Sequence, residues 1–122
     1  MKTTARKWVP LARAKWVAWE WPAFVDFFAG LTLQELEAAV IRHEECVRIQ
    51  SNEITTKFKD DVNALTEHAS HMRTVGANLI ALKGGLIPAL KVDKDNMKLH
   101  QIAAQCMAFV KAEYDYMKND LF

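Results

Sequence analysis

The stretch LTLQELEAAVIRHEECVRIQSNEITTKF, residues 31–58, contains the clearest signal for the start of a helix. Thr32 is a favoured N-cap residue, and Glu35, three positions later, completes the pattern of a capping box. Leu31 before the cap and Leu36 after it are spaced to form a hydrophobic staple. The sequence therefore predicts a helix that begins at about residue 33.

An apolar stripe continues in phase far beyond the end of this stretch. Neither glycine nor proline interrupts residues 32–75, and the stripe repeats every three or four residues as far as about Lys83. The average spacing of about 3.6 residues fits a nearly straight helix. An unbroken helix over residues 33–83 would be about 75 Å long. A compact domain of 122 residues would be only about 35 Å across.

Two all-α architectures resolve this conflict. In the first, one long central helix (about 33–83) is continuous and shared by two helical hairpins, each of which needs a second copy of the chain to cover its apolar face. In the second, the helix breaks in QSNEITT, residues 50–56, whose polar residues are weak helix formers, and a four-helix up-down bundle closes within one chain. Phase continuity favours the first architecture, and the usual length of helices favours the second.

The remaining segments also show helical spacing, and nothing divides residues 1–122 into more than a single all-helical domain. One helix is expected from about residue 4 to 20, followed by a short piece that Gly30 ends. The apolar stretch GGLIPALKV is expected to be a partly packed loop after a helix C-cap. A last helix should start at Asp93 or Asp95 and end near Asn119.

All four tryptophans lie in KWVPLARAKWVAWEW, residues 7–21. Trp8, Trp16 and Trp19 recur on one helical face, which we interpret as a core or subunit interface, with an external protein partner or a membrane surface as alternatives. The segment 1–21 holds five basic residues against one acidic, whereas residues 26–70 hold nine acidic against four basic. The two segments are therefore suited to pack together, within one chain or between chains.

In the continuous-helix architecture, the centre of the long helix has the least cover from its own chain. Val47, Ile54 and Phe58 lie there, so we expect them at a partner or subunit interface in a homodimer with some coiled-coil character. In the closed bundle, the same three side chains would be buried within one chain.

Metal chemistry is suggested only by EHASHM, in which His68 and His71 are three residues apart on a helix. His100 and Cys106 of the last helix could reach the same region, but the sequence lacks the Glu-x-x-His pairs of di-iron bundles. We therefore expect no metal and no cofactor. His43 lies in the apolar stripe and is interpreted as a hydrogen-bonded residue that sets the register between helices, without a catalytic role.

The charge balance and the cysteines restrict the class of protein. The net charge of +1 gives no general attraction to nucleic acid or anionic lipid. Cys46 and Cys106 form no C-x-x-C pair. We expect both to be buried, reduced cysteines of a protein in a reducing compartment. No signal-peptide core and no run of about 18 apolar residues is present, so we expect a cytoplasmic protein with no transmembrane segment.

The sequence favours a non-enzymatic helical protein that acts through protein–protein interaction, as an adaptor, an inhibitor or a small subunit of a larger complex. It shows no paired nucleophile and base that would indicate catalysis. Two alternatives remain open. One is a helical-bundle protein that binds a metal or a small ligand, and the other is a nucleic-acid-binding accessory subunit that uses the basic, Trp-rich N-terminus.

Overall fold

The computed structural model describes residues 22–121, with side chains as far as Lys118, and this part of the chain is an all-α helical bundle without strands. Its helical segments are residues 22–29, α3 (Leu33–Lys57), α4 (Val62–Ala81), the π-helical turn η1 (Leu82–Leu86), α5 (Ile87–Val92) and α6 (Met97–Leu121). Because α4, η1 and α5 follow one another without a break, they form one rod, which we call α4–α5. The predicted fold class is confirmed.

The start of α3 follows the predicted capping box. The Thr32 hydroxyl accepts a hydrogen bond of 3.1 Å from the Glu35 backbone N–H, and the Glu35 carboxylate accepts one of 2.9 Å from the Thr32 N–H. Leu36 is fully buried, and Leu31 packs against the core. Two of the N–H groups that a helix start leaves unsatisfied are thus bonded reciprocally.

Replacing Thr32 with alanine should therefore lower the free energy of unfolding by about 1 kcal/mol, since both the side-chain acceptor and the reciprocal geometry are lost. Urea denaturation of the wild type and the variant measures this difference. Thr55→Ala is a matched control, because the Thr55 hydroxyl donates only to carbonyls of its own helix. An unchanged midpoint for Thr32→Ala would contradict the cap.

The end of α3 differs from both sequence expectations. The helix is not continuous over 33–83, and residues 50–56 are helical throughout. The chain instead turns at residues 58–61, where the Asp61 carboxylate accepts from the Ala64 N–H at 3.1 Å and caps α4. Phe58 ends α3 with its ring buried beside Ile54 and Ala64. Because the apolar spacing stays in phase across this turn, periodicity alone does not reveal it.

The stretch GGLIPALKV is also helical rather than a loop. It spans most of η1 and all of α5, and its Ile87 and Leu90 side chains are buried in the core. Pro88 lies directly after the π-helical turn η1, at the start of α5. Burial of these side chains outweighs the low helix propensity of the two glycines. The cap of the last helix is Asn96, whose side chain accepts from the Leu99 N–H at 2.9 Å, and not Asp93 or Asp95.

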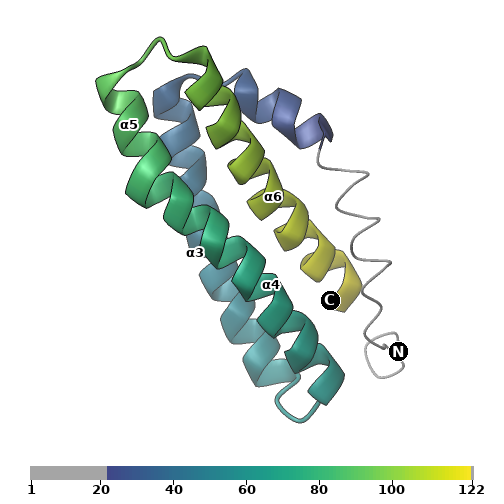
Figure 1. Cartoon of the computed structure of the whole chain (residues 1–122). Helices are drawn as coiled ribbons and strands as arrows, with labels where there is room; N and C mark the ends of the chain where they lie inside the picture. The colour runs from purple at the N-terminus through teal and green to yellow at the C-terminus, as the bar shows by residue number, and fades with distance from the viewer. Residues whose placement is uncertain (1–21, 122) are drawn as a thin grey trace.

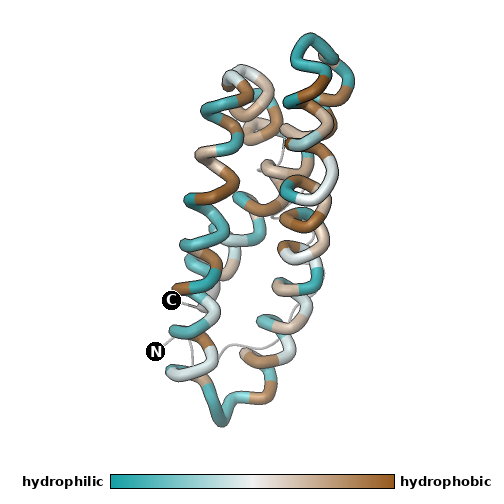
Figure 2. The backbone as a smooth tube through the Cα atoms, turned by 90° about the vertical axis from the view of Figure 1, so that its left-hand side faces the viewer, coloured by the Kyte–Doolittle hydropathy of each residue, from teal (hydrophilic) through white to brown (hydrophobic). Residues whose placement is uncertain are grey.

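The three long rods run side by side and alternate in direction, with turns at residues 58–61 and 93–96 (Figure 1). Residues 22–29 lie at the end of the bundle where α3 starts, and Val25 and Phe28 are buried in the main core. Hydrophobic and hydrophilic residues alternate along each rod (Figure 2). At 25 residues, α3 and α6 are each about 38 Å long, so the turn at 58–61 resolves the conflict over length.

The rod α4–α5, Val62–Val92, has 31 residues and is long and apolar enough, by length and composition, to cross a membrane. The expected absence of such a segment is therefore not confirmed. Core helices of soluble bundles meet the same criterion, but only 28% of the most apolar stretch of this rod is buried. The two lysines in η1 and α5 bind carboxylates of α3: Lys83 bonds Glu44 at 2.8 Å, and Lys91 bonds Glu37 at 2.7 Å.

Candidate functional site

In the second half of α4–α5, residues 77–92, the solvent side carries an apolar surface one turn beyond the exposed Arg73, and we call this surface the outer face. It consists of exposed residues that are mostly small: Ala77, Ile80, Ala81, Gly84, Gly85, Pro88, Ala89 and Val92. Ile80 is 74% exposed and Val92 is 90% exposed. The ion pairs with α3 occupy the Lys83 and Lys91 ammonium groups at the edge of this face. Because these apolar side chains lie together on one helix, the outer face is a candidate contact surface.

The two glycines of the outer face are not explained by packing within the described part of the chain. A Cβ built on Gly84 or Gly85 meets no atom within 4 Å, and neither residue has a positive φ. Glycine in a helix costs up to about 1 kcal/mol relative to alanine. These glycines therefore lower the helix propensity of the rod while leaving a flat surface that another helix can approach closely.

On other elements, residues 22–29, α3 and α6 together form a cavity of about 640 Å³, which we call the aromatic groove. Its lining residues are Ala23, Phe24, Phe27, Phe28, Arg42, His43, Cys46, Lys111 and Tyr114. The first helical segment supplies three phenylalanines at i, i+3 and i+4. Phe28 is buried, whereas Phe27 is 62% exposed, and their rings meet edge to face at 5.2 Å.

The polar groups of the aromatic groove are mainly cationic. The Lys111 ammonium lies 5.8 Å from the centroid of the Phe24 ring and bonds the Asp115 carboxylate at 3.0 Å. The His43 ring stands edge to face with Phe28, and its Nδ1 lies 2.8 Å from the Ala39 carbonyl oxygen. Since a carbonyl only accepts, Nδ1 carries the proton. This bond lies within α3, so His43 does not set the register between helices as the sequence had suggested.

Burial lowers the pKa of His43, and the nearby Lys111 and Arg42 lower it further. Burial also lowers the pKa of His68, which faces His71. When folding lowers the pKa of a histidine, there is a pH range between its folded and unfolded pKa values. In that range the ring is neutral in the folded chain and protonated in the unfolded chain. Its contribution to stability is complete above the unfolded pKa of about 6.5 and is lost as the pH falls through that value.

We therefore expect the midpoint of urea unfolding to fall when the pH is lowered from 7.5 to 5.5. The double variant His43→Gln/His68→Gln should show a weaker dependence on pH over the same interval. His100→Gln is the control, because it removes a half-buried histidine of α6 that does not line the aromatic groove. Parallel pH profiles for the wild type and the double variant would show that these two histidines do not produce the effect.

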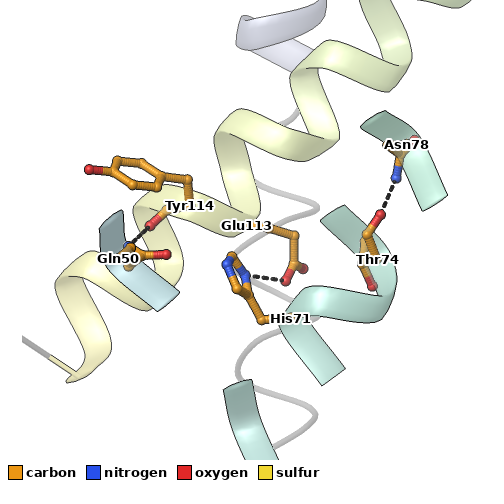
Figure 3. Close-up of polar contacts among 6 residues, drawn as sticks. All are labelled: Gln50, His71, Thr74, Asn78, Glu113 and Tyr114. Carbon is orange, nitrogen blue, oxygen red and sulfur yellow. Dashed lines mark hydrogen bonds and ion pairs between the residues drawn. The ribbon is translucent and has the colours of Figure 1, made fainter. Parts of the chain in front are cut away.

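A third group of polar residues is sealed inside the bundle, where Gln50, Glu67, His71 and Glu113 are each at most 4% exposed. His71 of α4 points at Glu113 of α6, with 3.4 Å between Nδ1 and Oε1 (Figure 3). The Gln50 amide of α3 donates to the Tyr114 carbonyl at 3.1 Å. These contacts join α3, α4 and α6 through polar groups in a largely apolar interior.

The predicted histidine pair does not form a metal centre in the described part of the chain. His71 is buried against Glu113, while Nε2 of the half-buried His68 lies 3.2 Å from the Ser51 hydroxyl. Their ring centroids are 6.4 Å apart. No group of three or more His, Cys, Asp or Glu side chains among the described residues is arranged to hold a metal ion.

The predicted interface residues divide into two groups. Val47, Ile54 and Phe58 are buried in the interior of one chain, at most 7% exposed, so they do not present an interface at its surface. The reason is the turn at 58–61, which folds α4 back along α3. Trp8, Trp16 and Trp19, with the basic segment around them, lie outside the described residues. The free thiols Cys46 and Cys106 are half-buried, and burial raises the pKa of Cys106.

The outer face and the aromatic groove were both missed by sequence reasoning. The sequence does not reveal the outer face, because the two glycines of GGLIPALKV favour a loop over a helix. The groove combines residues from three separate segments, of which only the spacing of the phenylalanines was visible in the sequence. The chain matches no protein-family model, no curated protein and no solved structure.

Proposed function

We propose that this protein is a non-enzymatic helical protein that acts through protein–protein contact, and that the outer face of α4–α5 is its contact surface. The observation that carries the proposal is the exposure of Ile80 and Val92 on a face without charge. Water-exposed apolar side chains of this size gain free energy when a partner covers them. An adaptor, an inhibitor or a small subunit of a larger complex would each use such a face.

A second copy of the chain fits this surface. In a two-fold contact the same face meets itself, so a charged face would oppose like charges. The outer face avoids this repulsion, since Lys83 and Lys91 at its edge are paired with Glu44 and Glu37. Its alanines and glycines also allow two helices to approach closely. We therefore retain the proposal of a homodimer, but through α4–α5 instead of the centre of α3.

A lysine at Ile80 tests the contact surface. Ile80→Lys should weaken self-association at least about tenfold, because the contact would bury an unpaired ammonium group. Ile41→Lys is the matched control, since Ile41 is 59% exposed on α3 and lies outside the outer face. Sedimentation velocity over a range of concentrations gives the dimer dissociation constant of each variant. Equal weakening by the two substitutions would reject the outer face as the interface.

The glycine pair offers a second test that separates folding from association. Gly84→Ala/Gly85→Ala should raise the free energy of unfolding by about 1 kcal/mol under monomeric conditions, because neither glycine requires a positive φ. The same double variant should dimerise more weakly, because two methyl groups then stand between the helices. A variant that gains stability and dimerises as the wild type does would place the contact elsewhere.

We further propose a cytoplasmic location, which the free thiols of Cys46 and Cys106 support. Alkylation of rapidly quenched cells should find both cysteines reduced. Recovery of either cysteine as a disulfide would argue against a reducing compartment.

A further inference from the structure

The aromatic groove has a size and a lining typical of small-molecule sites. Its volume of about 640 Å³ lies inside the range of about 300–1,000 Å³ in which such sites usually fall. Most of its lining is apolar or aromatic, and the exposed Phe27 ring forms part of one wall. A mostly apolar cavity with a few polar groups orients a ligand that combines an apolar body with a polar group.

Both charged residues among the described lining of the groove, Arg42 and Lys111, are positive. Lys111 already bonds Asp115, but no carboxylate partner is recorded for the exposed Arg42 among residues 22–118. A guanidinium group binds a carboxylate through two parallel N–H donors, which makes arginine the better of the two anion ligands. Burial lowers the pKa of His43, so its ring adds no positive charge to this wall of the groove.

We infer that the aromatic groove binds a small amphipathic organic anion, which has an apolar body and a single carboxylate head group. The head group binds Arg42, with Lys111 as the second cation, and the apolar body packs against Phe27 and Phe28. This site lies on residues 22–29, α3 and α6, so it is distinct from the outer face of α4–α5 and goes beyond the proposed function. Its occupancy does not depend on the protein being a dimer.

Dodecanoate and dodecyltrimethylammonium form a matched pair of probes, because they share a chain length and differ in the charge of the head group. Isothermal titration calorimetry, below the micelle-forming concentration of each, should show one dodecanoate bound per chain. We expect it to bind about tenfold more tightly than the cationic probe, from one charge-assisted contact. Phe27→Ser should weaken the binding of both probes, because it removes part of the apolar wall.

Arg42→Glu should abolish or reverse the preference for the anion. Arg73→Glu is the matched control, since it makes the same change of net charge at an exposed position of α4 that does not line the groove. Circular dichroism confirms that each variant stays helical. The inference is overturned if dodecanoate does not bind, if both probes bind equally, or if the two arginine variants weaken dodecanoate binding to the same extent. These outcomes do not depend on the dimer dissociation constants of the Ile80 and Ile41 variants, so the ligand site and the dimer are tested separately.

Discussion

Replacing Ile54 with aspartate is expected to unfold the chain at every protein concentration. Ile54 is completely buried and packs with Phe58, Ala64, Tyr116 and Met117, where α3, α4 and α6 meet. The substitution removes an apolar side chain and forces a carboxylate into the cluster that these side chains form. We expect a loss of at least about 4 kcal/mol, a large part of the stability of a typical domain.

Ile41→Asp is the control for this substitution, because it makes the same chemical change at an exposed position of α3. Circular dichroism and urea denaturation should show the control close to the wild type and Ile54→Asp largely unfolded. If Ile54→Asp were instead a folded monomer, Ile54 would belong to an interface between chains. That outcome would support the continuous helix over 33–83 and contradict the turn at 58–61.

Removing the Glu113 carboxylate should cost about 3 kcal/mol of stability. Glu113→Ala leaves the Nδ1 donor of His71 without this acceptor in a site that water does not reach. The double variant His71→Leu/Glu113→Leu removes the Nδ1 donor and its carboxylate acceptor together. The double variant should therefore lose much less stability than the sum of the two single leucine variants.

Urea denaturation of the wild type, the two single leucine variants and the double variant completes the cycle. Glu37→Ala is a suitable control, because it removes a partly exposed ion pair with Lys91 and should cost less than about 1 kcal/mol. If the losses of stability at His71 and Glu113 were additive, the two side chains would not be energetically coupled. Their contact would then not stabilise the packing of α4 against α6.

The sequence was sufficient to predict elements that depend on local chemistry. The capping box at Thr32 involves residues only three positions apart, so its hydrogen bonds follow from the sequence alone. The all-α class follows from apolar spacing over long segments. The turn at 58–61 depends on the burial of Phe58 against residues that come from α4 and α6. Such long-range packing does not change the spacing of apolar residues along α3, so the spacing does not predict the turn.

The same reasoning explains what was missed at the candidate sites. The two glycines before Ile87 favour a loop by propensity, but the buried Leu82, Ile87 and Leu90 hold the segment against the core as a helix. Local patterns did not indicate that His71 is buried, because its partner Glu113 lies 42 positions away. The aromatic groove likewise joins distant segments, so neither its volume nor its charge could be predicted before the fold was known.

The mass of the wild-type protein in solution tests the central claim, contact through the outer face of α4–α5, most directly. Multi-angle light scattering during size-exclusion chromatography should give twice the chain mass of 13.9 kDa at micromolar concentration. Ile80→Lys should give the mass of a single chain at the same concentration, with unchanged helix content. A wild-type mass of one chain across the whole accessible concentration range would contradict self-association through this face.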